Sequence, residues 1–417
     1  MNIKKEPSAL FRWLILVFIS LAMFGNYYIY DSISPLADVL TKQLGFNDSD
    51  IGLLVGIYSV PNIFMVLIGG MIIDRFGTRS STFVFALLCM IGAFITAFSG
   101  GVLFIMALGR LIFGLGAESM IVGITTVIGR WFKGKQLSFA FGLNLTIARL
   151  GSFTAFNSPT WARSFYDNWQ APLIIAVLFG VLSVASIVIY WGMDVYAEKS
   201  YSFHRVPKQD KFNFKELLSF NTSFWYIVLL CVTFYSAIFP FETFAVKFFI
   251  EVHHTTRAHG GFLLSMIKIF AMVFSPLFGL LSDYIGHRSL LMMFGSFLLL
   301  PVYLMMAYTD VNLYIPMAMM GISFSLIPAI MWPSVAIIID EVKLGTAYGL
   351  MSMVQNIGLA GFNFLIGWTN DYSGGYNLGM WIFSSLGFFG LIFAYLLRRN
   401  ELSPQGHGLE QGIKRKS

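Results

Sequence analysis

Two residues of opposite charge, Glu118 and Arg149, lie deep inside consecutive apolar segments. Glu118 lies 12 residues before Arg130, where its segment ends, and Arg149 lies 13 residues after Gln136, where the next segment begins. If both segments are helices with a rise of ~1.5 Å per residue, each charge is roughly 18–20 Å from the same end. A hydrocarbon core is ~30 Å thick, so both charges would lie near the middle of a bilayer.

Such a pair of charges can bind both ends of a zwitterion. A carboxylate at Glu118 would hold an ammonium group, and the guanidinium of Arg149 could bind a carboxylate through two parallel hydrogen bonds. The alternative is a structural ion pair between neighbouring helices, because an ion in hydrocarbon needs a partner or a water-filled cavity. We expect the zwitterion site, since transporters built from two repeats bind their substrates at this depth.

Other polar and aromatic side chains inside the apolar segments are further candidates for substrate contact: Tyr30, Asp31, Lys268, Trp332, Gln355 and Asn356. Each also has a structural interpretation. Asp31 could form a hydrogen bond that closes a gate, Trp332 could pack between helices beside Pro333, and the two amides could bridge helices. Lys268 needs a partner at its depth, and Glu242 is a second acidic residue in an apolar segment.

Composition excludes the soluble classes of protein. Of 417 residues, 57% are hydrophobic and 12% are charged, whereas about a quarter of a typical soluble domain is charged. The net charge of +6 lies mostly in short loops and tails, so no nucleic-acid partner is expected. The sequence contains no catalytic residues in a recognisable arrangement, no phosphate-binding loop and no metal-ligand cluster. We therefore predict no enzyme activity, no cofactor and no metal site.

Twelve apolar segments are long enough to cross a bilayer, which needs about 20 residues per helix. They span residues 11–40, 50–72, 81–99, 102–129, 136–160, 171–193, 223–250, 258–282, 289–308, 311–338, 345–370 and 376–398. We predict an all-α polytopic membrane protein with a six-helix half at 1–193, a polar linker at 194–222, a second half at 223–400 and a tail at 401–417. A short amphipathic helix is expected around 213–220.

The distribution of lysine and arginine predicts the orientation. The loops on one side carry most of the basic residues, together with both termini and the linker. Both termini are therefore expected in the cytoplasm. We predict a monomer in the lipid bilayer of the cell membrane that binds a small-molecule substrate.

An internal repeat supports two equivalent halves. The pattern Gly-x-x-x-Asp with a following glycine and arginine occurs around Asp74 and again around Asp283, 209 residues later. A second pair, Gly142 and Gly349, is 207 residues apart. We expect the two aspartate loops to act as a cytoplasmic gate through Asp74, Arg75, Arg79, Asp283 and Arg288. The alternative is that these loops only form tight turns and determine orientation.

The loop Gly70-x-x-x-Asp74-Arg75-x-Gly77-x-Arg79 resembles the signature of the major facilitator superfamily, as does its second copy, which has Tyr284 in place of an arginine. Arg110-x-x-x-Gly114-x-Gly116 is similar to another motif of the superfamily. The resemblance covers essentially the whole chain. It implies two pseudo-symmetric six-helix halves that alternate access to a central site.

Further motifs resemble the branch that contains the lysosomal dipeptide uniporter: Gly109-Arg110 through Glu118-Ser119, Trp131 to Lys135, Ala148-Arg149, Tyr30-Asp31, Phe239-Pro240-Phe241, Trp332-Pro333, Leu344 to Gly349 and Gln355-Asn356. This resemblance implies facilitated transport of dipeptides by a bacterial relative in the inner membrane, with Glu118 and Arg149 as the charged site. Glu242 and Lys268 depart from the pattern and could mark another substrate or coupling mode. The alternative function is proton- or sodium-coupled symport of another small organic solute, with Asp31 or Glu242 as the proton carrier.

Overall fold

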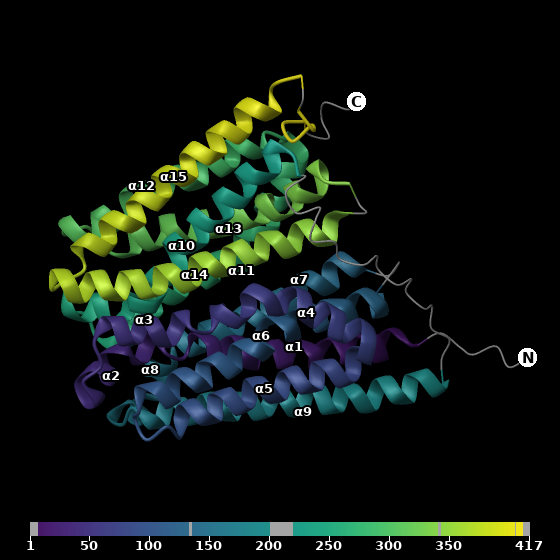
Figure 1. The fold of residues 1–417 in the computed structure, drawn as a ribbon, viewed down its shortest axis with the longest axis horizontal. Helices are drawn as coiled ribbons and strands as arrows, with labels where there is room; N and C mark the ends of the chain where they lie inside the picture. The colour runs from purple at the N-terminus through teal and green to yellow at the C-terminus, as the bar shows by residue number, and fades with distance from the viewer. Residues whose placement is uncertain (1–6, 133–135, 201–219, 341–342, 405, 412–417) are drawn as a thin grey trace, which may run out of the picture. The chain divides into compact units, whose positions relative to one another are not determined.

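Long helices occupy all the predicted spans. The structure is a computed structural model that describes residues 7–132, 136–200, 220–340, 343–404 and 406–411, and none of these residues lies in a β-strand. The chain forms two compact units (Figure 1). Unit 1 contains the described residues up to Val39 and from Ile57 to Ser200, and unit 2 contains residues 40–56 and the described residues from 220 onward.

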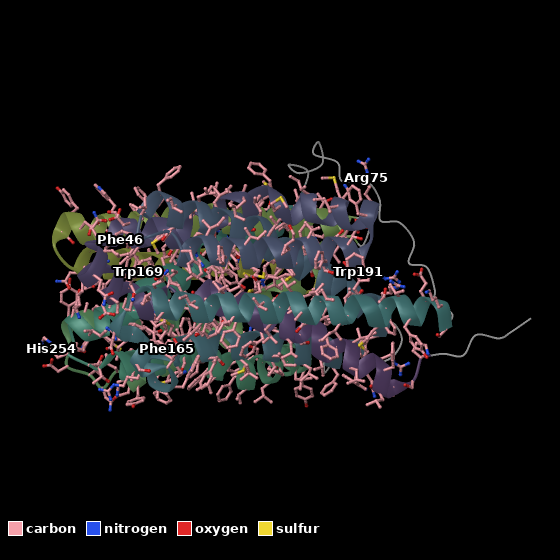
Figure 2. All side chains as sticks on the ribbon, turned by 90° about the horizontal axis from the view of Figure 1, so that it is seen from below. Phe46, Arg75, Phe165, Trp169, Trp191 and His254 are labelled. Carbon is pink, nitrogen blue, oxygen red and sulfur yellow. The ribbon has the colours of Figure 1, made fainter. Side chains whose placement is uncertain are left out.

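Unit 1 is a bundle of six long helices with short helical connections. Its elements are α1 (Ala9–Asp31), η1 (Ser34–Leu36), α4 (Ser59–Phe76), α5 (Thr78–Ala97), α6 (Leu103–Phe132), α7 (Leu137–Phe156), α8 (Ser158–Trp161), η2 (Arg163–Asp167) and α9 (Gln170–Ser200). The short helix α2 (Ala37–Leu44) contains the boundary between the two units. Figure 2 shows Arg75 at one end of this bundle, and Phe165 and Trp169 toward the other end.

Unit 2 is a second bundle of six long helices. They are α10 (Thr222–Glu251), α11 (Arg257–Ile285), α12 (Arg288–Tyr308), α13 (Tyr314–Ile338), α14 (Leu344–Ser373) and α15 (Asn377–Glu401), and the shorter α3 (Asp48–Gly56) packs against α14. The predicted span boundaries agree with these helices to within a few residues, except at the positions described below.

The helices pack in the same order in both units. In unit 1, α1 packs against α7 and α9, α5 packs against α6 and α9, and α4 packs against α6. In unit 2, α10 packs against α14 and α15, α12 packs against α13 and α15, and α11 packs against α13. The first helix of one unit thus corresponds to the first helix of the other, and so on through the sixth. This correspondence confirms the two pseudo-symmetric halves that the repeat predicted.

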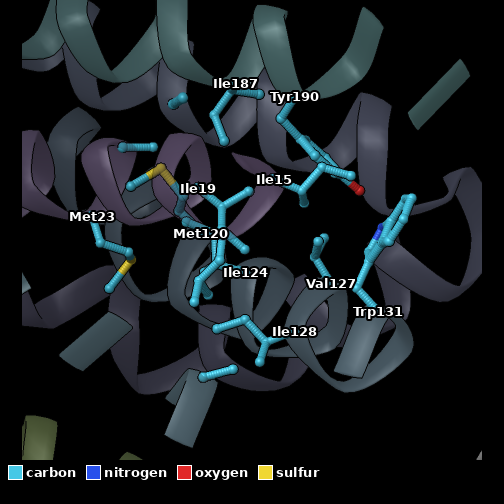
Figure 3. Close-up of a cluster of buried hydrophobic side chains, with 14 of the residues drawn as sticks. Ile15, Ile19, Met23, Met120, Ile124, Val127, Ile128, Trp131, Ile187 and Tyr190 are labelled. Carbon is cyan, nitrogen blue, oxygen red and sulfur yellow. The ribbon is translucent and has the colours of Figure 1, made fainter. Parts of the chain in front are cut away.

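Aliphatic side chains from three helices fill the centre of unit 1 (Figure 3). Ile15 and Ile19 of α1, Met120 and Ile124 of α6, and Ile187 of α9 are each fully buried, and Tyr190 and Trp131 close one end of the cluster. Membrane helices gain no hydrophobic driving force from leaving lipid for each other, so this close packing is what holds them together.

Two predicted spans are interrupted, and proline supplies the reason. The expected helix over 11–40 ends at Asp31, and the chain continues as η1 and α2 around Pro35. The expected helix over 50–72 is divided at Ile57 and Tyr58, four and three residues before Pro61. Proline has no N–H to bind the carbonyl four residues earlier, and its ring clashes with that carbonyl, which belongs to Asp31 for Pro35 and to Ile57 for Pro61. Both regions are still long and apolar enough to cross a membrane, so the two predicted spans hold and the breaks are a detail that the prediction did not include.

The sixth helix is longer than predicted, because α9 continues to Ser200 and includes the first residues of the expected linker. The amphipathic helix expected around 213–220 lies almost entirely outside the described residues. Among the described helical segments, eleven are long and apolar enough to cross a membrane. The twelfth, α7, is not among them, and it carries Asn144 and Arg149.

The glycines of the two aspartate loops both have a positive φ. Gly77 joins α4 to α5 with a φ of 83°, and Gly286 joins α11 to α12 with a φ of 68°. Side chains with a Cβ rarely adopt this region, so glycine permits the sharp turn between the helices. This explains why the motif contains glycine at these positions.

Candidate functional site

Glu118 lies on α6 and is half-buried. The hydroxyl of Tyr58, which precedes α4, donates a hydrogen bond of 2.8 Å to Oε1 of Glu118. Gly114, one turn earlier on α6, makes this contact possible, because a Cβ there would lie 2.3 Å from the carbonyl oxygen of Tyr58. The glycine therefore lets the start of α4 lie directly against α6, beside Glu118.

Arg149 lies on α7 and is also half-buried. The backbones of α1 and α7 approach closely, because a Cβ on Gly151 would lie 2.2 Å from the carbonyl oxygen of Phe24. The hydroxyl of Tyr27, one turn further along α1, lies within electrostatic range of Glu118, Arg149 and Asp31. Unit 1 thus gathers three of the predicted residues around one tyrosine.

Arg110 holds the end of α1 in place. This buried guanidinium donates to the carbonyl oxygens of Ile29 at 3.1 Å and Tyr30 at 3.2 Å. Both carbonyls belong to the last turn of α1, where no further helical N–H is available. The ring of Tyr30 lies 4.8 Å from that of Tyr58, so Arg110 positions Tyr30 and Asp31 next to the tyrosine that binds Glu118.

Lys268 finds its partner within unit 2. Its ammonium donates hydrogen bonds of 2.8 and 2.9 Å to the two carboxylate oxygens of Glu242. It also lies over the rings of Phe239 and Phe324, at 5.1 and 4.8 Å from their centroids. Lys268 is 4% exposed and Glu242 is 3% exposed, so this is a closed ion pair.

The remaining predicted residues of unit 2 lie on α13 and α14. The indole nitrogen of Trp332 donates to the hydroxyl of Tyr235 at 3.0 Å. Gln355 accepts a weak hydrogen bond from the thiol of Cys231, with a distance of 3.8 Å. Asn356 donates to the carbonyl of Ser352 in its own helix at 3.0 Å. Its side-chain oxygen is buried with no hydrogen-bond partner among the described residues, which is unusual.

The first aspartate loop binds a partner that sequence reasoning missed. Asp74 and Arg75 are exposed, whereas Arg79 forms ion pairs with Asp194, and with Glu198 at 2.7 Å. Asp194 is fully buried on α9. The sequence placed it at the start of the polar linker, because a hydropathy pattern does not show that the helix continues past the apolar core.

Two other side chains complete the environment of Asp194. Arg130 donates to one carboxylate oxygen at 3.3 Å and the indole of Trp131 donates to the other at 3.0 Å. In the second loop, Arg288 pairs with Asp283 of the same loop, and the backbone N–H groups of His287 and Arg288 donate to the carbonyl oxygens of Glu410 and Leu409. The two gating candidates therefore differ in their contacts although their motifs match.

Sequence reasoning also missed Tyr58 and Asp48. Tyr58 lies 16 residues before Asp74, so a rise of ~1.5 Å per residue would have placed it about 24 Å from the same end, near Glu118. Asp48 is buried in unit 2, where it pairs with Lys247 and accepts from the amide of Asn370 at 2.9 Å. In the described part of the chain, no three His, Cys, Asp or Glu residues lie together as metal ligands would.

Comparisons with known proteins concern the family and the fold of the chain. The profile of the Major Facilitator Superfamily matches residues 19–360 and 243–416. The chain is 33% identical over 379 residues to the lysosomal dipeptide transporter MFSD1 of Danio rerio, which covers 88% of this chain and 82% of the relative. It is 31% identical over 409 residues to the lysosomal dipeptide transporter MFSD1 of Homo sapiens, which covers 94% of this chain and 88% of the relative.

A solved structure of the nucleoside transporter NupG superimposes with a TM-score of 0.73 at 14% identity, covering 92% of this chain and 99% of that one. At this identity the likeness concerns the fold alone.

Proposed function

Because the chain belongs to the Major Facilitator Superfamily, we propose that it transports short peptides, and dipeptides in particular, by facilitated diffusion. The chain is a multi-pass membrane transporter and not an enzyme, as the sequence predicted. The twelve-helix fold with two pseudo-symmetric halves is likewise confirmed.

One observation carries the proposal: Glu118 and Arg149, on two different helices, are half-buried and lie within electrostatic range of the same hydroxyl, that of Tyr27. A dipeptide has an ammonium and a carboxylate a few ångströms apart. Glu118 would bind the ammonium and Arg149 the carboxylate. Recognition of the two termini leaves the side chains of the peptide unconstrained, which suits a transporter of varied dipeptides.

The neighbouring groups support this assignment. Tyr58 orients the carboxylate of Glu118 through its hydrogen bond, and Arg110 fixes Tyr30 and Asp31 beside it. In unit 2, the side-chain oxygen of Asn356, which has no partner among the described residues, could accept a hydrogen bond from a peptide N–H. We include Trp332, Gln355 and Lys268 among the proposed substrate contacts.

The proposal extends to topology and gating. Both termini lie in the cytoplasm and the protein resides, as a monomer, in a bacterial inner membrane. The halves at 1–193 and 223–400 alternate access to the site, and the loops with Asp74, Arg75, Arg79, Asp283 and Arg288 form the cytoplasmic gate. The relatives that are named lysosomal dipeptide transporters support the choice of substrate.

Ligand-induced thermal stabilisation of the purified protein tests the site. The panel contains dipeptides, with free amino acids, tripeptides and organic acids for comparison. Dipeptides should stabilise the wild type and lose this effect in Glu118→Gln and in Arg149→Ala. Asp310→Asn, a change in an exposed loop between α12 and α13, serves as the matched control and should behave as the wild type. An unchanged response in both site variants would refute the clamp.

Coupling is tested with protein reconstituted in liposomes. Facilitated diffusion predicts uptake that follows the dipeptide gradient and does not respond to an imposed pH gradient. The alternative, proton-coupled symport of another organic solute, keeps some support from the buried Glu242, which could carry a proton if Lys268 released it. Stabilisation by an organic acid alone, together with uptake driven by the pH gradient, would favour that alternative.

A further inference from the structure

Lys268 places its ammonium in a site formed by one carboxylate and two aromatic rings. Its ammonium lies between the carboxylate of Glu242 and the faces of two phenylalanines, Phe239 of α10 and Phe324 of α13. We call Phe239, Glu242 and Phe324 the ammonium cage. A carboxylate combined with aromatic faces is the arrangement that binds ammonium ions in proteins, because the rings and the carboxylate both attract a cation.

The cage is well desolvated, which strengthens its attraction for a cation. Glu242 is 3% exposed and Phe324 is 6% exposed. A carboxylate buried at membrane depth is strongly unfavourable unless a cation compensates its charge or a proton neutralises it, so the ionised cage attracts a cation. The side chain of Lys268 supplies one on a four-carbon tether, and a tethered group competes at a high effective concentration against free ligands.

The cage adjoins the proposed substrate contacts of unit 2. The ring of Phe239 lies 5.6 Å from that of Tyr235, and the hydroxyl of Tyr235 accepts the hydrogen bond from Trp332. A continuous row of aromatic side chains therefore leads from Trp332 to the cage. A basic side chain of a peptide that contacts Trp332 would carry the same group that Lys268 places in the cage.

We infer that the ammonium cage is a binding subsite for alkylammonium groups and that Lys268, its built-in occupant, selects against peptides with basic side chains. The selectivity part rests on the proposed function, whereas the binding part does not. Lys268 is thus a specificity-determining residue: it excludes a second ammonium by occupying the place that one would take.

Binding is tested with a small molecule that replaces the missing atoms. Lys268→Ala removes three methylene groups and the ammonium, which together correspond to n-propylammonium. Thermal stabilisation by n-propylammonium chloride is measured for the wild type, Lys268→Ala and Lys268→Ala/Glu242→Gln, with 1-propanol as the uncharged control. The half-saturating concentration for Lys268→Ala should be at least about tenfold lower than for the other two proteins. The ammonium cage is refuted as a binding site if n-propylammonium stabilises the single and double variants equally, or does not stabilise the single variant.

Folding of the single variant gives a second readout. Lys268→Ala leaves Glu242 without its ammonium, so its yield of folded monodisperse protein is compared after purification in sodium chloride and in n-propylammonium chloride. A higher yield in n-propylammonium chloride supports the cage. A variant that fails to fold in both salts contradicts the claim that an external ammonium can replace Lys268.

Selectivity is tested with alanyl-lysine and alanyl-glutamine, whose side chains are similar in length and differ in charge. Uptake of alanyl-lysine relative to alanyl-glutamine should rise at least about tenfold from the wild type to Lys268→Ala. An unchanged ratio overturns the selectivity part, while the n-propylammonium experiment still decides the cage. If no peptide is bound or transported by the wild type, the proposed function fails and the selectivity part fails with it, but binding of n-propylammonium remains a separate result.

Discussion

The two units share a helix packing order but hold their buried charges differently. In unit 1, Glu118 and Arg149 are half-buried on the fourth and fifth long helices. In unit 2, Glu242 and Lys268 are almost fully buried on the first and second, and they bind each other directly. The offset of 207 residues between Gly142 and Gly349 also relates Arg149 to Asn356, so the charge at this position is replaced by an amide.

The difference shows that the same packing of helices can hold either a closed ion pair or a charged group that is available to a ligand. A closed pair with two hydrogen bonds and aromatic neighbours satisfies its own charges, so a ligand that binds Glu242 has to displace the ammonium of Lys268. A half-buried carboxylate such as Glu118, which accepts a hydrogen bond from the hydroxyl of Tyr58, can exchange this contact for a ligand. We therefore expect the loss of a carboxylate charge to affect mainly stability at Glu242 and mainly substrate binding at Glu118.

The largest effect is expected in unit 2. Glu242→Gln removes the charge that compensates buried Lys268 and should lower the free energy of unfolding by about 3–5 kcal/mol, whereas pairing it with Lys268→Met should restore most of the loss. Glu118→Gln should cost far less stability. Thermal unfolding of the wild type, Glu242→Gln, Glu242→Gln/Lys268→Met and Glu118→Gln measures these differences in stability. If Glu118→Gln destabilises the protein as much as Glu242→Gln, the proposed difference between the two carboxylates is wrong.

A smaller effect is expected from Gly114→Ala in unit 1. The new Cβ would lie 2.3 Å from a backbone oxygen of Tyr58, so α4 has to move, at a cost of about 1–3 kcal/mol in unfolding free energy and with a weaker dipeptide response. In unit 2, Gly321→Ala meets a side chain, Phe270, at 2.8 Å and should cost less because a ring can shift.

Gly142→Ala is the control for these glycine variants, since a Cβ at this position would meet no heavy atom within 4 Å among the described residues and alanine favours a helix. Its thermal stability should equal or slightly exceed that of the wild type. If Gly114→Ala unfolds at the same temperature as Gly142→Ala, the close approach of α4 and α6 does not matter for the site.

Removal of single tyrosine hydroxyls distinguishes a contribution to substrate binding from a contribution to stability. Tyr58→Phe removes the hydrogen bond to Glu118 and should weaken dipeptide binding about tenfold, because a hydrogen bond to a charged group is worth about 1.5–3 kcal/mol. Tyr303→Phe in unit 2 removes a bond of 2.8 Å to the carbonyl of Ala237 and should lower stability by about 1 kcal/mol without changing dipeptide affinity. Calorimetric titration of both variants checks the contrast, which is lost if Tyr303→Phe also weakens binding.

The smallest effects are expected at the aspartate loops. The side chain of Asp283 is 55% exposed, so Asp283→Asn should lower the unfolding free energy by no more than about 1 kcal/mol despite its pairing with Arg288. Asp74→Asn should leave stability unchanged and slow transport, if this loop is part of the gate. Unfolding temperatures and initial uptake rates distinguish the two loops. Uptake at the wild-type rate by Asp74→Asn would argue against a gating role.

Most of the fold could be predicted from the sequence for a physical reason. Backbone groups in a bilayer have to bond within their own helix, so each span appears as a long apolar run. The depth of Glu118 and Arg149 followed from the regular rise of a helix, and the two halves followed from the offset between Asp74 and Asp283. The breaks near Pro35 and Pro61 were missed because apolar composition continues across them.

The sequence by itself determined which residues are charged at membrane depth, and therefore which ones need a partner. Only the tertiary structure decided the partners: Tyr58 for Glu118, Glu242 for Lys268 and Asp194 for Arg79. The reason is that contacts between helices depend on how each helix is rotated and how closely glycines allow two backbones to approach. Hydropathy reports whether a segment is buried in lipid, but it carries no information about which face of one helix meets which face of another.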